Sequence, residues 1–133
     1  MITRTFQGLA WLVVGGLVIE FYLAGAALFG ATTFQPHRAL GVGLAAAILL
    51  LLVVALIARP GRRVVGLAAA LTALTIVQML LPSLRAGLPW VAALHVVNAV
   101  ALASVTVSIA RALSLGAEAR DSREALLGTA ETS

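Results

Sequence analysis

GVGLAAAILLLLVVALIA, residues 41–58, decides the fold class of this 133-residue chain. The stretch contains no charged side chain, and the predicted helix that includes it runs over about residues 37–58. A helix needs about 20 mostly apolar residues to cross the hydrocarbon core of a bilayer, because each residue adds about 1.5 Å of rise. The stretch therefore predicts a transmembrane helix.

Three further apolar segments of similar length are present, at about residues 7–29, 64–81 and 90–110. The links between the four segments are short, and Pro36 and Pro89 fit the first positions of the helices that follow them. Short links make consecutive helices antiparallel neighbours. The sequence thus predicts an all-α fold, a four-transmembrane-helix up-down-up-down bundle over 1–111. Residues 112–133 are expected to form a cytoplasmic tail, either a short helix or disordered.

The composition agrees with a lipid environment. Hydrophobic residues make up 62% of the chain and charged residues 11%, whereas soluble domains have about 45–50% and about 25%. The net charge of +4 raises the question of nucleic acid, but the arginines sit at the ends of apolar runs rather than on one basic face. The chain has no cysteine, which excludes disulfides and thiolate metal sites.

The arginines also predict the orientation. Short cytoplasmic segments carry an excess of basic residues. Two arginines, Arg38 and Arg85, fall on one side of the expected bundle, and seven fall on the other: Arg4, Arg59, Arg62, Arg63, Arg111, Arg120 and Arg123. We therefore expect a multi-pass protein of the plasma (cell) membrane with both termini in the cytoplasm.

Polar residues at membrane depth gather in the outer half of the expected bundle. Such residues are functional candidates, because hydrocarbon offers them no hydrogen-bond partner. His95 and Asn98 are three residues apart and share one face of their helix. Glu20 reaches a similar depth on a neighbouring helix, so we expect it to bond Asn98 or His95. The candidate cluster consists of Glu20, Gln78, His95 and Asn98, with His37 and Arg38 at the rim.

Several roles for these residues stay open. Glu20 is either a neutral acid that ties two helices together, a proton-relay or ligand contact, or a contact to a partner protein. His95 is either a structural hydrogen-bonding residue, a metal or haem ligand, or a contact to a small ligand or proton path. Arg38 lies at a helix N-terminus, where free N–H groups favour anions, and a lipid phosphate is the simplest candidate there.

Haem b held between His37 and His95 is the most specific cofactor hypothesis. Counted from the inner arginines, however, the two histidines differ by six residues of height, which is about 9 Å of helix rise. Axial ligands of one haem need similar heights, so the count argues against this site.

Three short motifs resemble an uncharacterised family of small bacterial four-helix membrane proteins. They are Phe21-Tyr22-Leu23-Ala24-Gly25, His37-Arg38-Ala39-Leu40-Gly41 and Leu94-His95-Val96-Val97-Asn98-Ala99. The resemblance implies a four-helix membrane fold and a shared role for His37, Arg38, His95 and Asn98, and it carries no activity. A weaker likeness to four-helix membrane proteins that bind b-type haem lacks the two pairs of depth-matched histidines.

The leading functional expectation is a non-enzymatic membrane protein that binds a protein partner, a second copy of itself or a lipid-like ligand through its outer half. The alternative is a haem- or quinone-binding electron-transfer protein that uses His95, with His37 or Glu20 assisting. A small proton-coupled transporter is a third reading, and one buried carboxylate without an inverted repeat offers little for it. An enzyme is less favoured, because the sequence shows no nucleophile–base pair.

Overall fold

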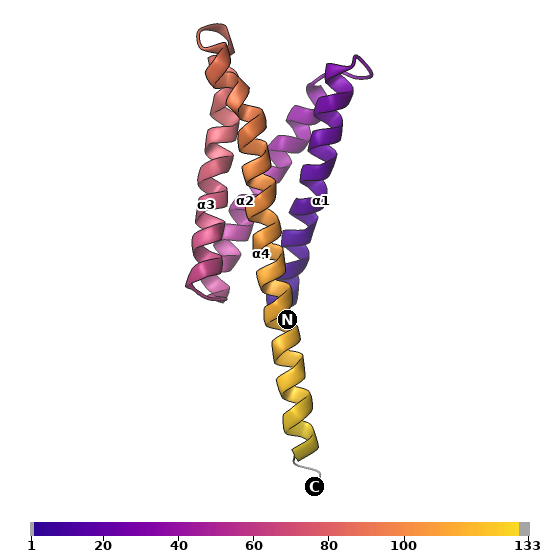
Figure 1. Ribbon diagram of the computed structural model, residues 1–133, viewed down its shortest axis with the longest axis vertical. Coiled ribbons are helices and arrows are strands. Elements are labelled where there is room, and N and C mark those ends of the chain that lie inside the picture. The colour runs from indigo at the N-terminus through magenta and orange to yellow at the C-terminus, as the bar shows by residue number, and fades with distance from the viewer. Residues whose placement is uncertain (1, 131–133) are drawn as a thin grey trace.

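The computed structural model describes residues 2–130 and confirms the predicted fold class. It contains α1 (Ile2–Leu28), α2 (Gln35–Ala58), α3 (Arg62–Leu80), the short 3-10 helix η1 (Leu81–Ala86) and α4 (Pro89–Ala130). The α-helices pack into a bundle (Figure 1), and all four are long and apolar enough to span a membrane. The protein is therefore a multi-pass membrane protein by helix length and hydropathy.

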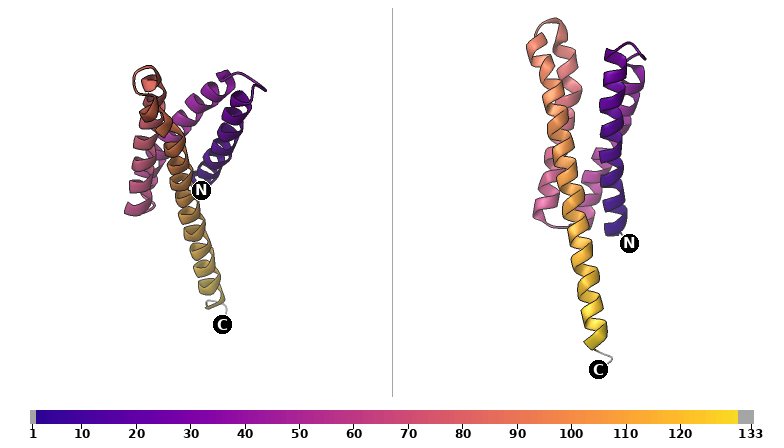
Figure 2. Two further views of the ribbon diagram at one scale, coloured as in Figure 1. Left: turned by 45° about the horizontal axis from the view of Figure 1, so that its top comes forward. Right: turned by 45° about the vertical axis from the view of Figure 1, so that its right-hand side comes forward.

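The bundle has two different ends, which we name from Figure 1. The upper end carries the α1–α2 link and η1, and the lower end carries the α2–α3 turn and the start of α1. Toward the upper end the α1–α2 pair and the α3–α4 pair spread apart, and the two further views in Figure 2 show the same divergence. The four helices are thus two hairpins that meet below and separate above.

Buried apolar side chains hold the hairpins together in the lower part of the bundle. Each helix contributes a stripe, and the largest fully buried apolar members are Phe6, Val13, Ile48, Leu51, Leu71 and Ile109. On α1, Gly16 leaves room for the Leu44 side chain, since an added Cβ would lie 2.4 Å from its Cδ2 atom. The α1–α2 contact therefore depends on close approach at a glycine, as expected for helices that associate in lipid.

The links end the helices by local backbone chemistry. Gly30, with φ +78°, follows α1, and its N–H donates to the Ala27 carbonyl while the Ala31 N–H donates to the Ala26 carbonyl. This is the Schellman arrangement, which needs the left-handed conformation that glycine adopts freely. The four-residue spacing of Ala26 and Gly30 is also the spacing of a small-residue packing pair between membrane helices. Nothing lies within 4 Å of a Cβ placed on Gly30, so this glycine serves to end the helix.

Helix α4 continues as one helix from Pro89 to Ala130, well below the other three (Figure 1). Its apolar span runs over Pro89–Ala119. Near the lower end the Gln7 side chain donates a 2.9 Å hydrogen bond to Ser114 and ties α1 to α4. Residues 131–133 of the expected tail, and the side chains of Arg120 and Arg123, lie outside the described part of the chain.

Candidate functional site

The first half of the site is a pair between α1 and α2. The Nδ1 atom of His37 contacts Oε2 of Glu20. The Glu20 residue is 8% exposed, and its Oε1 lies 3.2 Å from where a Cβ on Gly41 would stand. The missing side chain at Gly41 therefore makes the space that the carboxyl group occupies. The contact at Nδ1 fixes the orientation of the His37 ring.

The second half of the site joins α3 to α4 through His95. Its Nδ1 donates a 3.0 Å hydrogen bond to the Gln78 backbone carbonyl, and its Nε2 lies 3.2 Å from Nε2 of the Gln78 side chain. The carbonyl is open to this contact because Pro82, four residues later, has no N–H to donate along the helix. A proline in η1, just after α3, thus leaves free the acceptor that orients His95.

Asn98 completes the α3–α4 half. Its Nδ2 donates to the Leu74 backbone carbonyl at 2.9 Å and to Oε1 of Gln78 at 2.7 Å. Because Oε1 accepts from Asn98, the Gln78 amide nitrogen is the atom that donates to His95, and the ring therefore carries its proton on Nδ1. These interlocking bonds fix the amide orientation and the histidine tautomer together.

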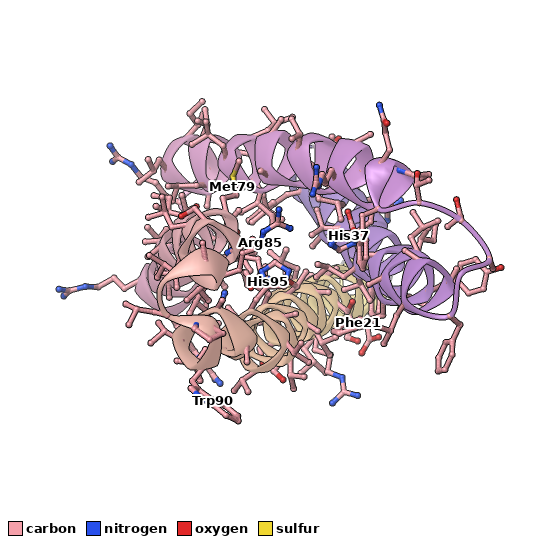
Figure 3. The ribbon with its side chains drawn as sticks, turned by 90° about the horizontal axis from the view of Figure 1, so that it is seen from above. Phe21, His37, Met79, Arg85, Trp90 and His95 are labelled. Atoms are coloured by element: carbon pink, nitrogen blue, oxygen red, sulfur yellow. The ribbon has the colours of Figure 1, made fainter. Side chains whose placement is uncertain are left out.

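The two halves meet at the histidines. The ring centroids of His37 and His95 are 6.3 Å apart, and the rings lie edge to face at 77°. Seen from the upper end, both rings lie near the middle of the ring of helices (Figure 3). We call Glu20, His37, Gln78, His95 and Asn98 the polar cluster. Its residues come from all four helices, and within each hairpin they make polar contacts between the two helices.

Two sequence-based expectations about this cluster are wrong. The partner of Glu20 is His37 on α2 rather than Asn98 or His95 on α4, because α1 and α4 diverge at this height (Figure 1). The residue count also separated His37 from His95, whereas the structure places their rings in contact range. The count assumed parallel helix axes, and α2 instead runs obliquely across the back of the bundle.

The two upper arginines lie in different surroundings. Arg38 lines a hollow of about 400 Å³ with Gln35, Ala39 and Val42, one stripe of α2, and makes no contact with the polar cluster among the described hydrogen bonds and ion pairs. Arg85, which entered the sequence-based argument only through the count of arginines, reaches from η1 toward the middle of the bundle beside His95 (Figure 3). The signal that could have found it is its position just after Pro82, in a turn that bends over the bundle.

The contacts of the two histidines restrict how they could bind a metal ion or haem iron. Both ring nitrogens of His95 are engaged by Gln78, so ligation by His95 would require Gln78 to move. His37 keeps Nε2 available. Among the residues that the structure describes, no group of three or more histidine, aspartate and glutamate side chains is placed to hold a metal ion. The site as built fits hydrogen bonding to a ligand better than coordination of a metal.

Comparison with known proteins identifies one relationship. Residues 20–86 match a family of unknown function, DUF6220. The matched range begins at Glu20, includes His37, Gln78 and Arg85, and ends before the helix that carries His95. No curated protein and no solved structure matches the chain. Since the match extends over half of the chain, the protein belongs to the DUF6220 family.

Proposed function

We propose that this protein is a non-enzymatic membrane subunit that binds a lipid-like ligand, or a membrane partner that inserts a polar group, in the upper half of its bundle. The observation that carries the proposal is the polar cluster itself. Five polar side chains from four helices converge where the hairpins separate. Polar side chains are costly to bury at membrane depth, and where they occur they commonly mark functional sites.

The contrast between the two halves favours binding over transport. Below Asn98 the described interior is a packed apolar core, and the buried hydroxyls of Thr75 and Thr106 donate to carbonyls of their own helices. A proton or solute path would need polar groups on both sides of the site. Below the polar cluster lie mostly apolar side chains, an arrangement that favours binding at this end over passage through the bundle.

The arginine distribution supports an orientation with both termini in the cytoplasm. The α2–α3 turn at the lower end carries Arg59, Arg62 and Arg63, while the upper end carries only Arg38 and Arg85. By the positive-inside rule the upper end then faces the exterior. The ligand or partner would reach the polar cluster from the outer leaflet or from outside the cell.

The test is to extract the full chain from native membranes in a mild detergent and identify what stays bound by native mass spectrometry. We expect a lipid-like molecule or a membrane protein to remain on the wild-type chain. The matched variant is His37→Phe, which keeps a ring in place but removes the contact with Glu20. A second variant, Thr72→Val in α3, removes a hydroxyl that bonds only its own helix and controls for stability.

The expected result is loss of the bound species from His37→Phe and retention by Thr72→Val. A wild-type chain that runs alone, with no lipid and no partner, would contradict the proposed function. Equal retention by both variants would show that the species binds elsewhere on the bundle.

The electron-transfer alternative draws support from one observation, the proximity of His37 and His95. A 6.3 Å separation of ring centroids is near the span of two imidazoles on opposite sides of one metal ion with bonds of about 2 Å. The oxidised and reduced absorbance spectra of the purified protein decide the haem version. A Soret band that disappears in His95→Ala would make haem-based electron transfer the preferred function, and a featureless spectrum would exclude bound haem.

A further inference from the structure

The charges of the upper end are unbalanced in favour of cations. Glu20 is the only acid before residue 118, since the other four carboxylates are at positions 118, 121, 124 and 131. Glu20 is engaged within the α1–α2 hairpin, because its Oε2 contacts His37 and its Oε1 packs over Gly41. Beside this pair, the upper end of the bundle presents the guanidinium of Arg85 and Nε2 of His37, with no further carboxylate from the residues before position 118.

Arg85 differs from an ordinary interfacial arginine in its direction. Although exposed, it lies near the middle of the ring of helices rather than outside it (Figure 3). The described hydrogen bonds and ion pairs give it no partner. An unpaired guanidinium that reaches over a membrane-embedded site favours an anionic group, because charge-assisted and bidentate bonds to phosphate are strong.

Apolar side chains lie on both sides of these cationic groups. Met79, which is 57% exposed, lies on the α2–α3 side of Arg85, and Phe21, which is 43% exposed, lies on the α1–α4 side (Figure 3). Helices α2 and α3 share the tight turn at the lower end and diverge upward (Figures 1 and 2). A ligand with one anionic head and long acyl chains matches this combination, with its head at Arg85 and a chain along Met79.

We infer that the polar cluster is a site for an anionic phospholipid whose phosphate is bound by Arg85 and by His37 through Nε2. Glu20 acts as a positioning residue that holds His37 by Nδ1 and leaves Nε2 directed to the ligand. The inference rests on the proposed function and names its ligand class. The recognised chemistry is a phosphate group with a net negative head, attached to an acyl chain.

The test uses the full chain in mild detergent with phosphatidylglycerol and phosphatidylcholine of identical acyl chains, in competition, read out by native mass spectrometry. We expect one tightly bound phosphatidylglycerol with about a tenfold preference. Both lipids offer a phosphate to Arg85, but only phosphatidylcholine brings a cationic choline beside the guanidinium, and like charges repel. Arg85→Gln should abolish the preference, and Arg85→Lys should keep part of it. Arg63→Gln, an exposed arginine at the lower end, is the control and should keep all of it.

Three results would overturn the inference. One is equal binding of the two lipids by the wild-type chain. Another is an equal loss of preference in Arg85→Gln and Arg63→Gln, which would assign the effect to general surface charge. The last is displacement of the lipid by inorganic phosphate at equal concentration, which would make this a free-phosphate site. If the native chain retains a neutral ligand that His37→Phe releases, the proposed function stands and only this inference fails.

Discussion

Substitutions of His95 and Pro82 should have coupled effects on the free energy of unfolding, even without a contact between the two side chains. In His95→Leu the bundle loses the 3.0 Å bond to the Gln78 carbonyl and the 3.2 Å contact with the Gln78 amide. Hydrogen bonds between transmembrane helices average about 0.6 kcal/mol. The carbonyl also loses its side-chain donor, which costs about 1–3 kcal/mol in a buried site. We therefore expect His95→Leu to lower the free energy of unfolding by about 2–4 kcal/mol.

The Pro82→Ala background should reduce this cost. An N–H at position 82 can donate to the Gln78 carbonyl along the helix, so the carbonyl keeps a donor when His95 is absent. The cost of His95→Leu should then fall to about 1 kcal/mol, a coupling of about 1–3 kcal/mol, well above the additivity error of about 0.5 kcal/mol.

The assay is reversible unfolding of four proteins in mixed detergent micelles, followed by far-ultraviolet circular dichroism. The four are the wild type, the two single variants and the double variant. If His95→Leu costs the same in both backgrounds, the carbonyl that Pro82 leaves open is not what anchors His95, and the reasoning is refuted.

Three further predictions test other contacts. Gly41→Ala should destabilise the bundle by about 1–2 kcal/mol, because the added methyl group crowds the Glu20 carboxyl. Gly8→Ala is the control and should be neutral or stabilising, since nothing lies within 4 Å of its added Cβ. Unfolding measurements that rank the two variants in the opposite order would contradict the contact at Gly41. Asn98→Leu should cost about 1 kcal/mol, because both hydrogen bonds that its Nδ2 donates to α3 disappear, and an unchanged unfolding midpoint would contradict these bonds. The chain has no cysteine, so Thr32→Cys should react with a membrane-impermeant maleimide on intact cells while Arg62→Cys should not, and the reverse pattern would invert the proposed orientation.

The bundle was predictable from the sequence because lipid imposes simple rules. The apolar run at residues 41–58 indicates a membrane span, and the short links allow few arrangements of the four helices. Pro36 and Pro89 stand at or next to the first residues of α2 and α4, as their fixed φ and missing N–H suggest. These features are local, so a single sequence contains them.

The pairing inside the site was only partly predictable, because it depends on where helix axes cross. Spacing placed His95 and Asn98 on one face of α4 correctly, yet it could not say that this face meets α3 rather than α1. The partner of Glu20 follows from the close approach of α1 and α2 at Gly16 and Gly41. The tilt of α2, which brings His37 to His95, arises from packing of whole helices and leaves no short motif in the sequence.

Helix α4 is one long continuous helix, so it transmits a change in tilt from the upper end of the bundle to the lower end. Asn98 and Ala130 belong to the same helix, and the 32 residues of rise between them correspond to about 48 Å. Since no kink or loop separates these points, a small change in tilt at the polar cluster becomes a displacement of several ångströms at the far end. A spin label at Leu127, an exposed residue in the lower part of α4, should therefore report occupancy of a site at the opposite end of the bundle.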